Sequence, residues 1–185
     1  MKIILNDNGL RALINFRIDV IHHFIAKGYQ VVLIYPACTR EESLIDNIPQ
    51  ECKVYEVDMN PSGNNPVKDF SYFRQLYKIY SIEKPDIIFH YTIKPNIYGT
   101  FAAKLLRIKT VDMVAGLGYI FTGNDIKNKM GRRLYKTGLR LANKVIVLNS
   151  YNYELLLNKG FVLSNNLILF KGGEGVNLKH FNYAQ

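Results

Sequence analysis

The chain has 185 residues, of which 48% are hydrophobic, and a formal net charge of +9 from 24 Lys and Arg against 15 Asp and Glu. This length suits one domain, and the apolar content excludes a disordered tail. The charge indicates an anionic partner, whether nucleic acid, phospholipid or phosphorylated metabolite. Cys38 and Cys52 have neither metal-binding nor redox spacing, which argues against a zinc module and a disulfide scaffold.

Short apolar runs alternate with helical patterns along the chain. We predict strands at 3–5, 31–34, 54–57, 87–89, 111–114, 145–148 and 167–170, and helices at 10–27, 68–83, 96–106, 127–143 and 151–159. Most of the runs are continuously apolar, which is typical of strands covered on both faces. The alternation predicts an α/β fold with a doubly wound, mostly parallel sheet. Such sheets bind ligands beyond the carboxyl ends of their strands, so the candidate site lies in those loops.

The first predicted helix has an apolar face suited to packing on the sheet. Its main stripe follows helical spacing through Leu10, Ile14, Ile18, Ile21 and Ile25, and a second stripe contains Leu13, Arg17, Val20 and Phe24. Gly28 is expected to end the helix. Arg17 is the one charged residue on this face, and either extends to water at the sheet edge or faces a ligand.

The strongest charge pattern is an acid-free stretch between Ile126 and Tyr153. It carries seven basic residues: Lys127, Lys129, Arg132, Arg133, Lys136, Arg140 and Lys144. On a helix, we expect an inward face formed by Met130, Leu134, Thr137 and Leu141. The outward face is then either a solvated surface or a contact with an anionic membrane, through Lys129, Arg132, Arg133, Lys136 and Arg140.

No nucleic-acid-binding motif accompanies this charge, so we expect no nucleic-acid partner. No stretch approaches the ~20 apolar residues that span a bilayer. We therefore expect a cytoplasmic protein, peripheral at the inner face of the membrane.

Two loops after predicted strands carry candidate binding residues. The segment 116–123 has the form G-x-G-x-x-x-x-G, which is neither the dinucleotide fingerprint nor a P-loop, although its glycines allow close approach of backbone N–H groups to a ligand. In the segment 90–99, Lys94 suits a phosphate, and Asn96 suits a hydroxyl or a helix cap. His90 is either a proton-transfer group or a hydrogen-bonded residue at a strand end. No cluster of residues has metal-ligand spacing.

Four segments together resemble a known family. They are Asn15-Phe16-Arg17, the run from Tyr91 to Gly99, the run from Gly116 to Gly123, and Gly175-Val176-Asn177 with Phe181. In this order they resemble the N-terminal half of bacterial family-four glycosyltransferases, of the type that extends lipid-linked polysaccharide or oligosaccharide precursors. The resemblance covers essentially the whole chain.

The resemblance implies one half of a GT-B enzyme, in which two Rossmann-like domains face each other across a cleft. Residues 1–172 would be the acceptor-binding domain, and 173–185 the linker and the start of a missing donor-binding domain. The complete enzyme would use a nucleotide-sugar donor and retain the anomeric configuration, whereas this chain alone would hold no cofactor and be inactive. Its partners would be a lipid-linked or saccharide acceptor, the missing domain and an anionic membrane surface.

The resemblance also suggests site residues. Those expected to bind the acceptor are Gly9, Arg17, Lys94, Asn96, Gly116, Gly118 and Thr122. Many relatives have a histidine where Ala115 stands and a paired-glycine loop where only Gly9 is present. The nearby His90 is the candidate catalytic residue, although it does not match the family motif.

Two other functions fit parts of the pattern. One is half of a UDP-sugar 2-epimerase, which the segment 90–99 disfavours. The other is a flavodoxin-like adaptor at a membrane surface. Asp7 and Asp58 are available for a phospho-receiver site, but no matching lysine and acidic pair accompanies them. The donor sugar, the acceptor glycan and the linkage are not identified by the sequence.

Overall fold

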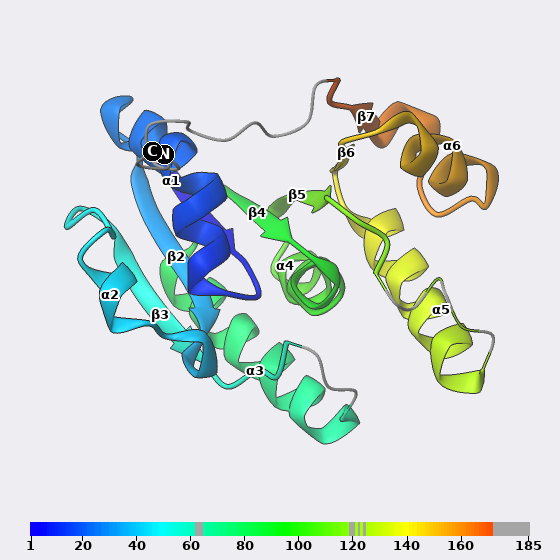
Figure 1. Cartoon of the computed structure of the whole chain (residues 1–185), viewed down its shortest axis with the longest axis horizontal. Coiled ribbons are helices and arrows are strands. Elements are labelled where there is room, and N and C mark those ends of the chain that lie inside the picture. The colour runs from blue at the N-terminus through cyan, green and yellow to red at the C-terminus, as the bar shows by residue number, and fades with distance from the viewer. Residues whose placement is uncertain (62–64, 119–120, 122, 124, 172–185) are drawn as a thin grey trace, which may run out of the picture.

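The computed structural model describes residues 1–61, 65–118, 121, 123 and 125–171. In this part of the chain a parallel sheet has helices on both faces (Figure 1). The strands are β1 Lys2–Asn6, β2 Gln30–Pro36, β3 Lys53–Val57, β4 Ile87–Tyr91, β5 Lys109–Val114, β6 Lys144–Val147 and β7 Leu167–Leu169. The predicted α/β doubly wound sheet is confirmed, and all its neighbouring strands pair in parallel.

The helices follow the predicted order with two differences. They are α1 Leu10–Ala26, α2 Glu42–Ile45, α3 Pro66–Glu83, α4 Thr100–Leu105, α5 Ile126–Leu141 and α6 Ser150–Asn158. Short α2 was not predicted, since four residues are too few for a periodic pattern. The helix predicted at 96–106 begins instead as a π-helical turn, η2, at Pro95–Gly99, and continues as α4.

Strand order places the candidate site. The sheet runs β3-β2-β1-β4-β5-β6-β7, so the chain reverses its direction of winding when α3 carries it from β3 back to β4. The carboxyl ends of β1 and β4 therefore lie side by side, with Asn6 in register with His90. A ligand crevice is expected at this switch point.

Alternating side chains on the strands fill two different cores. Ile3 and Leu5 pack with α1, whereas Ile4 packs with α3 and α4 on the opposite face. A third cluster, between β5–β7 and helices α5 and α6, includes Tyr135. Burial on both sides accounts for the continuously apolar strands.

Helix α1 buries most of its predicted face. Its fully buried side chains are Leu10, Leu13, Ile14, Arg17 and Ile21, while Val20 of the predicted second stripe is exposed. Gly28 follows with a φ of +73°, the left-handed conformation expected of a residue that ends a helix. The predicted end of this helix is confirmed.

Glu83 ties the end of α3 to the opposite, amino-terminal edge of the sheet. Its carboxylate lies 2.8 Å from the Nζ atom of Lys2 and 2.6 Å from that of Lys53, and it accepts a hydrogen bond from Tyr55. Burial raises the pKa of Glu83, but hydrogen bonds from Lys2, Lys53 and Tyr55 outweigh this effect and lower it to about 2. The folded state therefore favours the charged carboxylate.

We predict that Glu83→Gln lowers the melting temperature at pH 7, and that this difference fades in acid. An unfolded glutamate titrates near ~4.3, whereas folded Glu83 titrates at about 2. The stability from its charge is thus fully present above the unfolded pKa and is lost as the pH falls toward about 2. Thermal unfolding followed by circular dichroism from pH 7 to pH ~2 measures this. A difference that is constant with pH, or that also appears for Glu154→Gln on the exposed side of α6, would contradict the account.

Candidate functional site

The carboxyl ends of β1 and β4 and the loops that follow them, called the crevice below, contain a buried ion pair. Asp7 directly follows β1, and Arg17 extends from the second turn of α1 to reach it. Arg17 Nε lies 4.0 Å from Asp7 Oδ2, and the two side chains are nearly inaccessible to water. The Arg17 guanidinium lies 4.2 Å from the centre of the Tyr91 ring, at the end of β4. Arg17 thus joins the ends of both central strands, where sheets of this kind bind ligands, and does not extend to water, the other of its two predicted alternatives.

Gly9 begins α1 beside this ion pair. It has extended backbone angles and provides no side-chain cap. Thr39, from the loop after β2, supplies the cap instead, because its hydroxyl accepts a hydrogen bond from the N–H of Leu10 at 3.2 Å. The start of α1 is therefore held by the neighbouring loop.

Thr92 is a residue of this crevice that the sequence did not single out. It follows β4 with a φ of +71°, which is strained for a β-branched side chain. Its Oγ1 atom is buried and makes no hydrogen bond with the described residues. Such strain concentrates at functional sites. The signal available from sequence was a polar residue directly after a buried strand.

The glycine loop after β5 lies against the loop after β4. Gly118 has a φ of +64°, and a Cβ atom built on it would lie 2.4 Å from Cδ1 of Ile93. The positive φ, together with this contact, favours glycine at the point where the two loops meet. Gly116 is exposed, and no atom lies within 4 Å of its built Cβ position. The expected acceptor residue Thr122 lies outside the described residues.

Lys94 lies beside the crevice, in a pair with Asp69 of α3. Lys94 Nζ is 2.6 Å from Asp69 Oδ1, and the other oxygen of Asp69 accepts a hydrogen bond from the Tyr98 hydroxyl at 3.0 Å. Both charged residues are buried. Lys94 thus lies between α3 and η2.

Asn96 has a structural place in the core. It is fully buried, and its amide nitrogen donates to the Met113 carbonyl oxygen at 3.0 Å and to the Tyr135 hydroxyl at 3.3 Å. It thereby links η2 to β5 and α5. The Asn96 amide nitrogen is therefore bonded to protein atoms in the core, and Asn96 neither caps a helix nor faces an open site.

His90 belongs to a buried chain of hydrogen bonds beneath the crevice. The Tyr72 hydroxyl donates to Asn6 Oδ1, and the Asn6 amide donates to the Tyr80 hydroxyl. Tyr80 is 3.0 Å from His90 Nε2, and His90 Nδ1 is 2.9 Å from Asp112 Oδ1. Thr100 bonds the same carboxylate at 2.8 Å and 2.9 Å.

The direction of this chain defines the histidine tautomer. Burial raises the pKa of Tyr80 well above its ordinary value, so its hydroxyl keeps its proton. Because that hydroxyl accepts from Asn6, its own proton goes to His90 Nε2, and Nδ1–H donates to Asp112. Burial also raises the pKa of Asp112, and the hydrogen bonds from His90 and Thr100 oppose this effect.

His90 is fully buried, with both ring nitrogens engaged. Contact with a ligand would require opening the core. The geometry favours the second of its two predicted roles, a hydrogen-bonded residue at a strand end.

The predicted orientation of α5 is wrong. Met130, Leu134 and Thr137 were expected to face inward but are exposed. The buried residues are Tyr135, Gly138 and Leu139. A Cβ atom on Gly138 would lie 2.9 Å from the Asn96 carbonyl oxygen, so this glycine is where α5 packs most closely on η2. Glycine does not register as apolar in a hydropathy pattern, and the inward face was missed for that reason.

Three of the five basic residues expected to face a membrane contact backbone carbonyls of the domain. Arg132 donates to Gly123, Lys136 to Lys159 and Arg140 to Gly160, over distances of 2.6–2.9 Å. Lys129 and Arg133 are exposed. The described part of the chain has no group of three or more metal-ligating side chains, and none of its helices is long and apolar enough to cross a bilayer.

Comparison with protein families gives a match over most of the chain. Residues 8–149 match the family described as glycosyl transferase 4-like. Because the match covers well over half of the 185 residues, the chain belongs to the glycosyl transferase 4-like family. The resemblance to family-four glycosyltransferases that the sequence motifs indicated is confirmed at the level of the family. A search of curated proteins found no match.

Solved structures show the same fold in larger proteins. A glycosyltransferase from Rickettsia africae superposes with a TM-score of 0.63 at 16% identity, over 98% of this chain and 45% of that one. MurG from Acinetobacter baumannii gives 0.55 at 16% identity, over 80% and 41%. A UDP-GlcNAc 2-epimerase from Neisseria meningitidis bound to UDP-GlcNAc gives 0.66 at 16% identity, over 91% and 45%. The chain has the Rossmann-like fold of one half of such proteins, and spans less than half the length of each.

We predict that Gly99→Ala lowers the free energy of unfolding by about 1–3 kcal/mol, the usual cost of overpacking a core. A Cβ atom on Gly99 would lie 2.4 Å from His90 Nε2. Urea unfolding followed by circular dichroism measures the change. Gly116→Ala is the matched control, since no atom lies within 4 Å of its Cβ position, and should cost less than ~0.5 kcal/mol.

The double variant Gly99→Ala with His90→Ala tests the cause. If the clash with the imidazole is responsible, the two losses are less than additive. If the two losses in the free energy of unfolding are fully additive, the strain does not come from the contact with the imidazole.

Proposed function

We propose that this chain is the acceptor-binding half of a retaining glycosyltransferase, which moves a hexosyl or N-acetylhexosaminyl group from a nucleotide sugar to a lipid-linked glycan in surface polysaccharide synthesis. The match of residues 8–149 to the glycosyl transferase 4-like family carries this proposal. The crevice at the switch point of the sheet supports it, because that is where a domain of this fold presents a ligand to a second domain. Residues 1–172 would form this half, with 173–185 leading into a donor-binding half.

The crevice would position the acceptor hydroxyl for reaction. Arg17 lies where the ends of β1 and β4 meet, with Gly9 and Gly116 on adjacent loops. A guanidinium and accessible backbone N–H groups suit the hydroxyls and phosphate oxygens of an acceptor. In retaining transfer, the hydroxyl attacks the anomeric carbon from the face that the nucleotide diphosphate leaves. This half would contribute orientation, and the donor half would stabilise the charge on the leaving diphosphate.

We place the protein at the cytoplasmic face of a membrane, where a lipid-linked acceptor would be presented. The support is electrostatic: α5 carries six basic residues and no acidic one. Each Lys or Arg near an anionic leaflet contributes roughly 1 kcal/mol of attraction. Since Arg132, Lys136 and Arg140 contact loop carbonyls, we assign this attraction mainly to the exposed Lys127, Lys129 and Arg133.

Product analysis with a protein that carries both halves tests the reaction class. Incubation with a panel of nucleotide sugars and a lipid-linked acceptor should yield a glycoside with the anomeric configuration of the donor, as read from NMR coupling constants. Inversion would contradict the retaining mechanism. Conversion of UDP-GlcNAc to its C2 epimer without acceptor would establish the epimerase alternative, and neither reaction would favour an adaptor.

We predict that Arg17→Gln in the two-half protein lowers kcat/KM for the acceptor by at least about tenfold, because one buried charged contact contributes more than ~1.4 kcal/mol. Arg11→Gln is the matched control: it lies on the exposed side of the same helix, paired with Glu41, and should leave kcat/KM unchanged. Lys94→Ala should weaken acceptor use if Lys94 meets its diphosphate. Transfer unaffected by either Arg17→Gln or Lys94→Ala would remove that residue from the site.

We predict that the chain sediments with vesicles containing anionic phospholipid, and less with neutral vesicles or at raised ionic strength. Replacing Lys127, Lys129 and Arg133 by Gln should weaken binding by at least about tenfold, at roughly 1 kcal/mol per residue. The same changes at Lys27, Lys109 and Lys159, exposed residues outside α5, form the control for net charge. Equal losses in both sets would mean attraction without a preferred face.

A further inference from the structure

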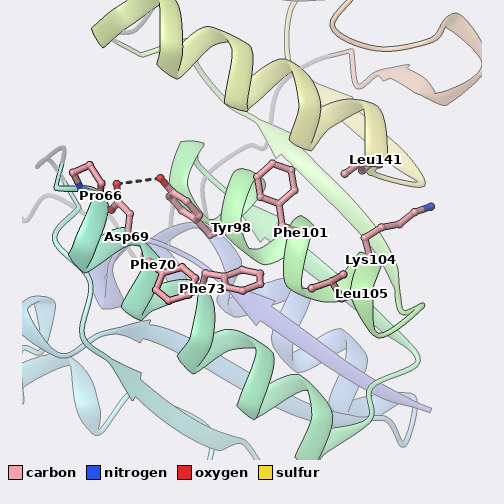
Figure 2. A pocket seen from close by; sticks show the side chains of 9 residues that line it. All are labelled: Pro66, Asp69, Phe70, Phe73, Tyr98, Phe101, Lys104, Leu105 and Leu141. Atoms are coloured by element: carbon pink, nitrogen blue, oxygen red, sulfur yellow. Dashed lines mark hydrogen bonds between the residues drawn. The ribbon is translucent and has the colours of Figure 1, made fainter.

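An apolar groove runs between α3, η2–α4 and α5, on one face of the sheet. One part has a volume of about 510 Å³ and is lined by Pro66, Asp69, Phe70, Phe73, Tyr98, Phe101, Lys104, Leu105 and Leu141. Figure 2 shows the aromatic side chains gathered along it, with Asp69 and Tyr98 joined by a hydrogen bond and Lys104 directed away from the other lining side chains. Neither the family match nor the crevice accounts for this groove.

A second cavity continues the first. It has a volume of about 390 Å³ and shares Pro66, Asp69 and Tyr98 with it. Its further lining includes Ile93 and Lys94 from the loop after β4, and Lys127, Met130 and Leu134 from α5. The lining on α5 thus extends from Lys127 to Leu141, which is about 20 Å at 1.5 Å per residue.

The groove has lysines from two elements at one end, and the rest of its lining is mostly apolar, with Lys104 directed away from the other lining side chains. In a parallel α/β fold each helix starts at the carboxyl edge of the sheet and ends at the amino edge. Lys94 and Lys127 stand near the starts of η2 and α5, at the crevice edge, whereas Leu105 and Leu141 stand at the ends of α4 and α5. The charged end therefore lies beside the proposed acceptor site, and the apolar part extends away from it.

The three helices that line the groove carry no exposed negative charge. The acidic residues within α3, α4 and α5 are Asp69 and Glu83, and each is buried in ion pairs with lysine. The same helices carry exposed basic residues: Lys68, Arg74, Lys78, Lys104, Lys127, Lys129 and Arg133. Phe70, Leu105, Met130 and Leu134 are exposed at the groove. An apolar channel with a basic rim suits an amphiphile with an anionic head and a hydrocarbon tail.

We propose that this groove binds the hydrocarbon chain of the lipid-linked acceptor, with the phosphate group at the end marked by Lys94 and Lys127. This inference rests on the proposed function, whose lipid carrier it places in the fold. The phosphate lies toward the crevice, so the attached sugar reaches the ends of β1 and β4. The chain occupies the space between Phe70, Phe101 and Leu134.

Titration calorimetry with farnesyl phosphate tests the groove on this chain directly. Farnesyl phosphate should bind at least about tenfold more tightly than inorganic phosphate or farnesol, because only it satisfies both ends of the groove. Met130→Asp and Leu134→Asp should each weaken binding by about tenfold or more, since they place a charge in the apolar wall. Ile82→Asp and Tyr151→Asp are the matched controls, exposed apolar side chains outside the groove lining, and should bind normally.

Several results would overturn the proposal. Equal losses in the lining and control variants would indicate adhesion to the whole surface. Binding of inorganic phosphate as tight as that of farnesyl phosphate, or no binding, would show that the groove takes no chain. A dimer by sedimentation velocity that Leu134→Asp dissolves would mean that a second copy covers it. A diazirine derivative of farnesyl phosphate adds a measurement on the unaltered chain: labels confined to α3, η2–α4 and α5 support the groove, and labels elsewhere refute it.

The groove and the proposed function can fail separately. If farnesyl phosphate binds as described but the two-half protein transfers no sugar to a lipid-linked acceptor, the groove stands and the reaction does not. If transfer occurs and Leu134→Asp leaves the acceptor KM unchanged for long and short prenyl chains, the reaction stands and the groove does not.

Discussion

The buried hydrogen-bonded chain from Tyr72 to Asp112 holds the centre of this molecule together. It crosses three strands and two helices, because Asn6 lies on β1, His90 on β4, Asp112 on β5, Tyr72 and Tyr80 on α3, and Thr100 on α4. Each member is buried, so an unmade bond would leave a polar group in an apolar surrounding at a cost of about 1–3 kcal/mol. The network therefore specifies how α3 and α4 (Figure 1) pack on the sheet.

The sequence predicted the architecture well and the side-chain environments less well. Continuous apolar runs and helical periods identified the seven strands and five of the six α-helices, because burial on both faces leaves a strong pattern. The same reasoning assigned the wrong inward face to α5. Its closest contact is made by Gly138, which has no side chain and so does not appear in a hydropathy pattern. Patterns of hydropathy report which residues are apolar, and close backbone approach leaves no such trace.

The candidate site was predicted by location more reliably than by role. Arg17 was recognised as unusual on an apolar face, and it does lie at the ends of β1 and β4. His90 and Asn96 were chosen for their polarity after a strand, yet both are committed to partners inside the core. Thr92 escaped notice because its positive φ is a property of the folded backbone. Sequence position indicates the loop, and only the fold decides which side chains turn inward.

The strand order also has a consequence for how the chain acquires its structure on the ribosome. Strand β1 is central, but its second neighbour β4 begins at Ile87, so one edge of β1 is unpaired until that segment has been made. Synthesis at ~5–20 residues per second leaves this edge open for several seconds or more. The Asn6 side chain also lacks its hydrogen-bond partners during that time, because they lie on α3, which is made later. An unpaired apolar edge of this kind is prone to association with other chains, and the strand order exposes the nascent first half of the molecule to that risk.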